Sequence, residues 1–180
     1  GNLIATIGTE RRQLVKYDEL PQVLIDAIIA TEDSRFFEHD GFDIPRFLKA
    51  GVGYIKGVDA GGASTLTMQL SKNTFTSTET KGFDGIVRKF TDIYMSIFKI
   101  EKDYSKEEII EFYVNAPYLG AGSYGVEQAS KTYFNKDVTN LNLVEAATIA
   151  GMFQAPGEYD PYINPQKTTK RKNEVIDLML

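Results

Sequence analysis

A stripe of apolar residues through positions 83–101 gives the clearest structural signal in this chain. Its members are separated by steps of three and four residues in turn, which is the spacing of one face of an α-helix. They are Phe83, Ile86, Phe90, Ile93, Ile97 and Ile100. No long segment alternates apolar and polar residues as a half-buried strand does, so the sequence predicts a mainly α fold.

Helix start signals predict two helices earlier in the chain. Asp18 is the expected N-cap of a helix that has Pro21 in its first turn and runs to about Thr31. Asp43 is the expected cap of a second helix. The apolar residues of this second helix are Ile44, Phe47, Leu48, Val52, Tyr54 and Ile55.

Later segments follow the same rules. Residues 73–85 resemble a polar loop, and residues 105–108 form a capping box for a helix that ends near Asn115. Residues 118–125 are a glycine-rich turn. Further helices are expected over residues 126–134, over about 142–151 and from Asn164 onward.

Composition narrows the class of protein. With 180 residues, 42% of them hydrophobic, the chain can bury one sizeable core, so we expect one domain over residues 1–180. It has no cysteine and a single histidine, His39, which excludes disulfides, thiolate chemistry and any zinc site with two imidazoles. The lack of cysteine fits a compartment outside the reducing cytoplasm. A net charge of −5 argues against nucleic acid as a partner.

No run is long enough to span a membrane, no signal peptide is recognisable, and Gly1 is expected to be a cut end.

Two adjacent carboxylates stand out in residues 32–41, which read Glu-Asp-Ser-Arg-Phe-Phe-Glu-His-Asp-Gly after an apolar run. Glu32 and Asp33 arrive at the carboxyl end of a buried helix, where the helix dipole disfavours negative charge. One interpretation is a polar exit from a core helix. The other is a carboxylate beside an apolar wall, where partial desolvation makes it a stronger proton acceptor. This stretch alone leaves both open.

Thr65, Gln69 and Lys72 recur at helical spacing and share one face of an expected helix that opens at Ser64. A hydroxyl, an amide and an ammonium beside a helix N-terminus suit a phosphate, although no Walker pattern points to a nucleotide. The simpler interpretation is that Ser64 caps an ordinary amphipathic helix.

Arg88 and Asp92 lie four residues apart in the long helix and would by default form a surface ion pair of little energetic value. Lys89 places a second cation directly beside Arg88, which keeps a functional role open.

Together these segments resemble the peptidoglycan glycosyltransferase domain, glycosyltransferase family 51, of class A penicillin-binding proteins and their monofunctional relatives. Five motifs occur in the family's order and span almost the whole chain, which makes the resemblance highly specific. They are residues 32–41, residues 62–73, Arg88-Lys89 with Asp92, residues 111–125 and Arg171-Lys172-Asn173.

The resemblance implies a lysozyme-like, mostly helical head lobe and a smaller, membrane-facing jaw at roughly residues 42–85. It implies that the domain polymerises lipid II, the undecaprenyl-diphosphate-linked disaccharide-pentapeptide, into β-1,4-linked glycan strands. The implied partners are lipid II, the growing glycan chain, the bacterial membrane surface and other cell-wall synthesis proteins. The implied location is the outer face of the cytoplasmic membrane, with the transmembrane anchor and any transpeptidase domain outside this chain.

The motifs also imply roles for individual residues. Glu32 is the implied catalytic base for the acceptor's 4-hydroxyl, and Asp92 is the second catalytic carboxylate. His39 and Arg171 are implied structural supports. The implied contacts to substrate and diphosphate are Asp33, Phe36, Ser64, Thr65, Gln69, Lys72, Asn73, Arg88 and Lys89. No cofactor or metal site is implied, although a divalent cation could stimulate the reaction.

Two positions depart from the family pattern. Asp92 stands where the family has a glutamate, so its reach is one methylene shorter, and Met68 replaces the first of two glutamines. One alternative function is a lysozyme-like glycan hydrolase, but such an enzyme needs no cationic site for a diphosphate. The other alternative is a catalytically silent module that binds lipid-linked glycan. Asp92 is the only feature of the sequence that favours this alternative.

Overall fold

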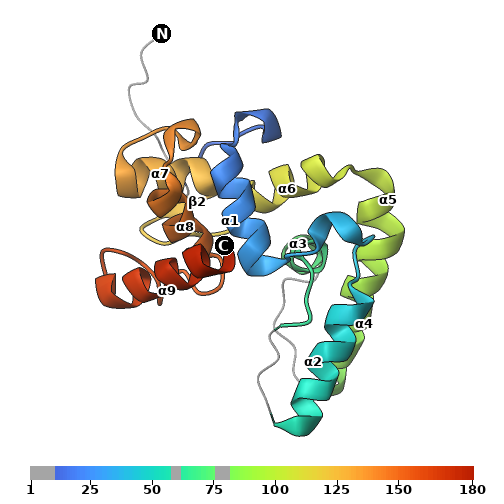
Figure 1. Cartoon of the computed structure of the whole chain (residues 1–180). Helices are drawn as coiled ribbons and strands as arrows, with labels where there is room; N and C mark the ends of the chain where they lie inside the picture. The colour runs from blue at the N-terminus through green and yellow to red at the C-terminus, as the bar shows by residue number, and fades with distance from the viewer. Residues whose placement is uncertain (1–10, 58–61, 76–81) are drawn as a thin grey trace. The chain divides into compact units, whose positions relative to one another are not determined.

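The structure of the chain, a computed structural model, describes residues 11–57, 62–75 and 82–180 (Figure 1). The chain forms two compact units. The terminal unit combines Gly1–Thr31 with Val114–Leu180, and the central unit is Glu32–Tyr113. The segment expected as the jaw, residues 42–85, falls within the central unit, and the helical content of both units confirms the mainly α fold.

The terminal unit is built around one buried helix. Its elements are β1 (Arg11–Arg12), η1 (Tyr17–Glu19), α1 (Gln22–Glu32), β2 (Ser123–Tyr124), α7 (Val126–Phe134), η4 (Val138–Asn140), α8 (Leu143–Met152) and α9 (Pro165–Leu178). Every residue of α8 from Ala146 to Met152 is buried, and α8 packs along α9 (Figure 1). Asn142 starts α8 through a capping box with Glu145. The two short strands pair in parallel.

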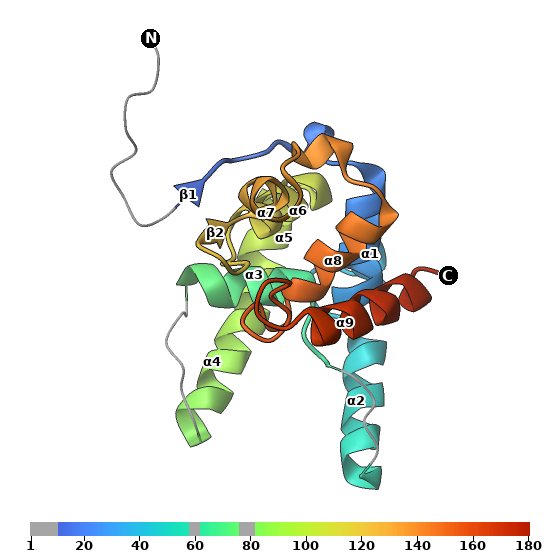
Figure 2. The ribbon, with the colours of Figure 1, turned by 90° about the vertical axis from the view of Figure 1, so that its left-hand side faces the viewer.

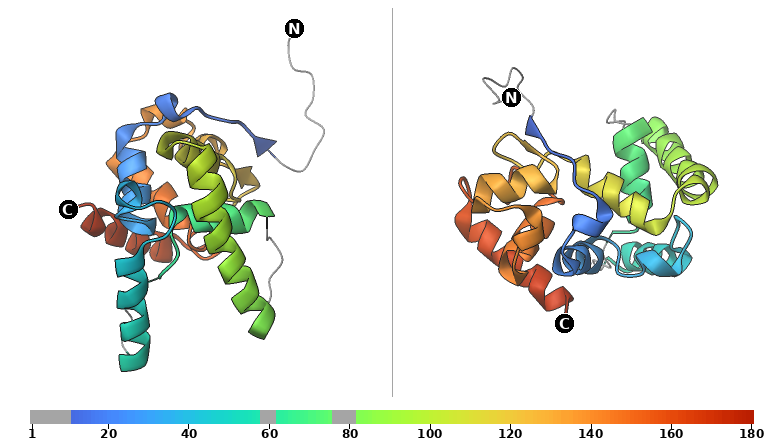
Figure 3. Two further views of the ribbon diagram at one scale, coloured as in Figure 1. Left: turned by 90° about the vertical axis from the view of Figure 1, so that its right-hand side faces the viewer. Right: turned by 90° about the horizontal axis from the view of Figure 1, so that it is seen from above.

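The central unit is organised around α3. Its elements are η2 (Phe36–Glu38), α2 (Ile44–Lys56), α3 (Leu66–Phe75), α4 (Gly82–Met95), the π-helical turn η3 (Ser96–Ile100), α5 (Glu101–Asp103) and α6 (Lys106–Asn115), of which the last two residues belong to the terminal unit. Five residues of α3 that lie around its axis are buried, and this helix packs against α4 and η3; they are Leu66, Thr67, Met68, Leu70 and Ser71. The helices α2 and α4 point away from each other at the ends that lie far from α3 (Figure 2, Figure 3).

Several local predictions are confirmed. The helix over residues 126–134 begins and ends where the sequence predicts. Asp43 caps α2, because its Oδ1 accepts the backbone N–H of Arg46 at 2.9 Å. Ser105 and Glu108 exchange the two hydrogen bonds of the predicted capping box at the start of α6.

Three local predictions are wrong. Asp18 does not cap α1, because it lies inside η1, where the backbone N–H of Lys16 donates to Oε2 of Glu19 at 2.8 Å. Thr65, not Ser64, caps α3, because the Thr65 hydroxyl accepts the backbone N–H of Met68 at 3.2 Å. The expected loop over 73–85 is partly helical, since α3 continues to Phe75 and α4 begins at Gly82. Residues 76–81 of this expected loop lie outside the described residues.

The apolar stripe of the long helix lies mostly on the surface. Phe83 and Phe90 are 76% and 68% exposed, whereas Ile100 is 3% exposed. The helix α2 likewise exposes Ile44 and Leu48. The side chains of Tyr54 and Ile55, which belong to the predicted apolar set of this helix, are outside the described part. Among the described residues, no helix combines the length and the hydropathy needed to cross a bilayer.

The glycine-rich turn before α7 depends on Gly120. This residue has φ +81°, and a Cβ added there would lie 2.5 Å from the Tyr133 hydroxyl and 2.8 Å from an oxygen of Asp160. That hydroxyl donates to the carbonyl of Leu119 and to Asp160. Burial and the Asp160 carboxylate raise the pKa of Tyr133, so the hydroxyl keeps its proton and its donor role.

Gly120→Ala is therefore expected to destabilise the protein by about 2 kcal/mol or more, through left-handed strain together with a clash. Gly122→Ala is the matched control, because Gly122 has φ +74° but no atom within 4 Å of an added Cβ. Its free energy of unfolding should fall only by the cost of the left-handed strain, about 1 kcal/mol. Urea unfolding followed by circular dichroism measures both, and equal losses would contradict the proposed clash.

Candidate active site in the central unit

Glu32 is held by a side-chain amide. Its Oε2 accepts a hydrogen bond from Gln69 Nε2 at 2.9 Å, and its backbone carbonyl accepts one from Arg46 at 2.9 Å. The Oε1 atom of Gln69 accepts in turn from the Tyr113 hydroxyl at 3.0 Å. Glu32 remains partly exposed, so a carboxylate of fixed orientation is accessible at the end of α1.

Asp33 is fully buried and connects four segments of the central unit. Its oxygens lie 3.1 and 3.2 Å from Nε2 of His39 and 3.3 Å from Nη1 of Arg46. They also accept the backbone N–H of Leu66 at 2.9 Å, which is the first residue of α3. The carboxylate of Asp33 therefore lies at the positive N-terminal end of α3, where the sequence suggested a phosphate.

A cluster of cations lies farther along α3 and on α4. Lys89 Nζ donates to the hydroxyl of Ser64 at 2.6 Å. Burial lowers the pKa of Lys89, Asp92 raises it, and Arg88 and Lys72 lower it further, so these three charged groups act on the ammonium. Asp92 is only 3% exposed, so the default surface ion pair does not describe it. We call the three cations Lys72, Arg88 and Lys89, together with the acidic Asp92 that acts on Lys89, the cation cluster.

Most of the other residues predicted for the site make contacts that stabilise the fold. Thr65 is buried, and its hydroxyl donates to the carbonyl of Gly41 as well as capping α3. Phe36 is buried under the Lys106 ammonium, which lies 4.3 Å from the ring centroid. Asn73 is exposed near the end of α3. Arg171 belongs to the terminal unit, where it lies over the ring of Tyr159 and pairs with Glu174 at 3.3 Å.

Sequence reasoning missed three residues that position this site. Arg46 contacts both Glu32 and Asp33, Tyr113 contacts Gln69, and Lys106 donates to the carbonyl of His39 at 2.6 Å and pairs with Glu101 at 2.8 Å. Lys106 and Tyr113 lie on or near the face of α6 that carries the buried Ile109 and Ile110. Helical periodicity gives that inward face, but not the partner of each polar group.

Asp33, His39 and Asp43 could in principle hold a metal ion, since one ligand atom from each lies within 4.8 Å of the others. However, Asp33 already contacts Arg46 at 3.3 Å, and Asp43 lies 3.6 Å from Arg35. Two guanidinium groups thus neutralise this carboxylate pair, which favours a structural role.

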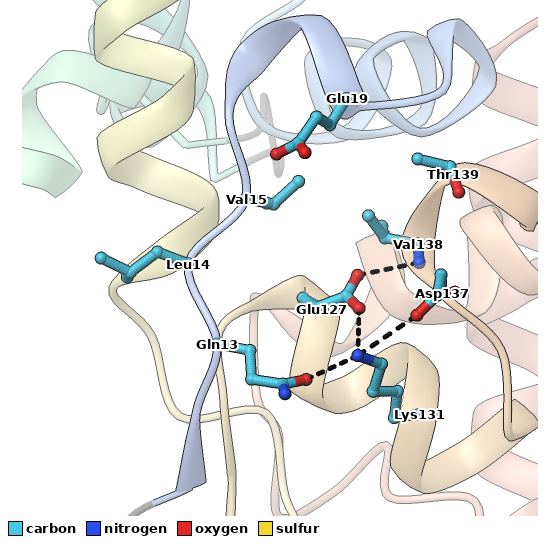
Figure 4. Close-up of a pocket in the computed structure, with 9 residues that line it drawn as sticks. All are labelled: Gln13, Leu14, Val15, Glu19, Glu127, Lys131, Asp137, Val138 and Thr139. Atoms are coloured by element: carbon cyan, nitrogen blue, oxygen red, sulfur yellow. Dashed lines mark hydrogen bonds and ion pairs between the residues drawn. The ribbon is translucent and has the colours of Figure 1, made fainter. Parts of the chain in front are cut away.

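The terminal unit contains an open cavity of about 560 Å³, but its lining has no predicted site residue (Figure 4). In Figure 4, Lys131 lies between the carboxylates of Glu127 and Asp137 and also donates to Gln13. Glu127 accepts the backbone N–H of Val138 at 2.9 Å. These groups satisfy one another, and the hydrogen bonds that Lys131 donates to Glu127 and then to Asp137 raise its pKa, so we place the chemistry in the central unit.

An accessible carboxylate held by an amide, together with a cation cluster on neighbouring helices, is typical of group-transfer enzymes with an anionic leaving group. The comparisons with known proteins agree. The family model described as Transglycosylase matches residues 1–180, and the chain belongs to this transglycosylase family.

Its relatives are much longer proteins. The chain is 44% identical to penicillin-binding protein 1A of Vibrio cholerae over 181 residues and 41% identical to that of Neisseria flavescens over 182 residues. Each match covers 100% of this chain but 21% and 22% of the relative, so the chain spans about a fifth of their length. The crystal structure of penicillin-binding protein 1A from Haemophilus influenzae matches with a TM-score of 0.55 and 28% identity, over 100% of this chain and 17% of that one.

Asp92→Asn is expected to lower the pKa of Lys89 further, because Asp92 is the acidic group that raises it. Arg88→Gln should shift the same pKa upward, since Arg88 lowers it. An NMR titration of the lysine side chains, assigned with Lys89→Arg, measures both. Shifts of the same sign in the two variants would contradict this arrangement of charges.

Proposed function

We propose that this chain polymerises lipid II into β-1,4-linked peptidoglycan glycan strands, with undecaprenyl diphosphate as the leaving group. One observation carries the proposal: Gln69, which holds Glu32, lies on the same helix as Lys72, and Lys72 acts on Lys89 in the cation cluster. A proton acceptor and a site for a developing negative charge thus belong to one rigid helix and its neighbours. Membership of the transglycosylase family supports the same reaction.

In the proposed reaction, Glu32 accepts the proton of the acceptor sugar's 4-hydroxyl as that oxygen attacks the anomeric carbon of the donor. The new glycosidic bond forms with inversion while the bond between that carbon and the diphosphate oxygen breaks. The electron pair leaves with the diphosphate, whose charge the ammonium and guanidinium groups of Lys72, Arg88 and Lys89 stabilise. This sequence of steps balances without a cofactor.

Observations in the central unit favour this reaction over hydrolysis. A two-carboxylate hydrolase needs an acid and a base around the sugar, but no group of three cations. Asp92, the candidate second carboxylate, is buried and acts on Lys89, which suits charge balance among the cations better than contact with a sugar. If Asp92 balances the charge of the cations, its side chain, one methylene shorter than that of glutamate, is no longer a sign of a catalytically silent module.

We further propose that the central unit contacts the outer face of the bacterial cytoplasmic membrane, where a lipid-linked substrate resides. Its support is the set of exposed large apolar side chains on α2 and α4. They are Ile44, Phe47, Leu48, Val52, Phe83, Ile86, Val87, Phe90 and Tyr94. Helices with such a face bind at membrane interfaces without spanning the bilayer.

Glu32→Gln is expected to abolish elongation of labelled lipid II in detergent, because an amide cannot accept the proton, while the variant stays folded. Gel analysis of glycan products measures elongation, and circular dichroism checks the fold. Glu38→Gln is the matched control, because Glu38 is a 65% exposed side chain that pairs with Arg35. Wild-type chain that binds lipid II without lengthening it would contradict the proposal, as would release of fragments from finished glycan.

Lys72→Ala is expected to lower the rate by about 10²-fold, the usual loss when one preorganised charge-stabilising group is removed. The control is Lys99→Ala, which removes a 60% exposed lysine paired with Asp103 in the same unit. Initial rates of polymerisation distinguish the two variants. Equal rates for Lys72→Ala and wild type would show that the diphosphate binds elsewhere.

A further inference from the structure

A buried hydroxyl stands at the start of the hydrogen-bond chain that reaches Glu32. Tyr113, near the end of α6, is only 4% exposed, and its hydroxyl donates to Oε1 of Gln69 at 3.0 Å. Nε2 of the same amide donates to Oε2 of Glu32 at 2.9 Å. The chain therefore connects three elements of the central unit, namely α6, α3 and the last residue of α1.

The direction of these hydrogen bonds is determined by their chemistry. A carboxylate can only accept, so it requires the NH₂ end of the Gln69 amide. The amide oxygen then faces Tyr113, whose hydroxyl must donate. A protonated Glu32 could instead donate to the amide oxygen after a flip of the amide, and the hydroxyl would then accept. A phenol hydroxyl donates more strongly than it accepts, because its oxygen lone pair is shared with the ring, so Tyr113 favours the amide orientation that suits the charged form of Glu32.

We propose that Tyr113 is a positioning residue for the transfer reaction: it fixes the orientation of the Gln69 amide and thereby keeps Glu32 as an oriented proton acceptor. The expected effect of Tyr113 on the rate of glycosyl transfer rests on the proposed function. It does not involve contact between Tyr113 and the substrate, because Tyr113 acts through Gln69.

The surroundings keep the proton on this hydroxyl, so that it can donate. Burial raises the pKa of Tyr113 well above its ordinary value, and the charges of Glu32 and Asp33 raise it further. The phenol therefore keeps its proton over the whole working range of pH. In the described part of the chain, the other polar side chains that contact this set are Arg46, which donates to the Glu32 carbonyl and to Asp33, and His39, which contacts Asp33. Among the described residues, the hydrogen bonds of Arg46 and His39 do not include the Gln69 amide, so they leave its orientation to Tyr113 and Glu32.

Tyr113→Phe keeps the ring and removes the donor. The amide oxygen of Gln69 then loses this buried partner, and the flipped amide with a protonated Glu32 becomes more favourable. The expected result is a kcat lower by about 5–10-fold, the ordinary value of one hydrogen bond, with little change in KM. The acidic limb of the rate–pH profile should move to higher pH, because the charged form of the base has lost support.

A matched control and a double variant make the test specific. Tyr133→Phe also removes a hydrogen-bonded hydroxyl, but in the terminal unit, and should leave the acidic limb in place. Gln69→Leu should itself move the limb to higher pH, and adding Tyr113→Phe to it should move the limb no further. An unmoved limb in Tyr113→Phe, or full additivity with Gln69→Leu, would overturn the positioning role.

A measurement without substrate separates this inference from the proposed function. The Glu32 carboxyl signal, assigned with Glu32→Gln in ¹³C-glutamate-labelled 180-residue chain, is titrated by NMR in wild type and in Tyr113→Phe. A higher titration midpoint in Tyr113→Phe supports the positioning role even if lipid II is not polymerised. An equal midpoint overturns it even if lipid II is polymerised.

Discussion

The buried carboxylate of Asp33 is the interaction on which the central unit depends. A buried charge is costly unless it is fully hydrogen-bonded, and Asp33 meets this demand with His39, Arg46 and the N-terminal N–H of α3. These contacts bring η2, α2 and α3 to the end of α1. Because Glu32 directly precedes Asp33, the same contacts place Glu32 within reach of Gln69. The orientation of the candidate base is therefore a consequence of a structural ion network.

This arrangement also explains where an anionic substrate group belongs. The N-terminus of α3 attracts anions, but the Leu66 N–H already donates to Asp33. A diphosphate would find the positive potential instead at Lys72, two turns along α3, and at the neighbouring Arg88 and Lys89 of α4. In the proposed reaction, this separation of the two anion sites assigns the carboxylates to the acceptor sugar and the cations to the leaving group.

Local signals in the sequence predicted most of the helices, because capping and periodicity act within one or two turns. The cap at Asp43 and the capping box of Ser105 and Glu108 needed nothing from distant residues. The cap of α3 was misplaced because a distant contact decides it: Lys89 takes the hydroxyl of Ser64, which leaves Thr65 to cap the helix. Arg46 and Tyr113 were missed for the same reason, since their partners are more than ten residues away.

The long helix shows a second limit of periodicity. A strict 3.6-residue period places Phe83 through Ile100 on one face, yet Phe83 and Phe90 are exposed and Ile100 is buried. Ile100 is the last residue of the π-helical turn η3, whose wider hydrogen-bond pattern changes the direction of the side chains along that turn. The Ser96 hydroxyl donates to the Asp92 carbonyl at 2.6 Å, where the pattern changes. The continuous helical segment from α4 through η3 thus exposes apolar residues at one end, carries Arg88, Lys89 and Asp92 in its middle and buries Ile100 near its other end.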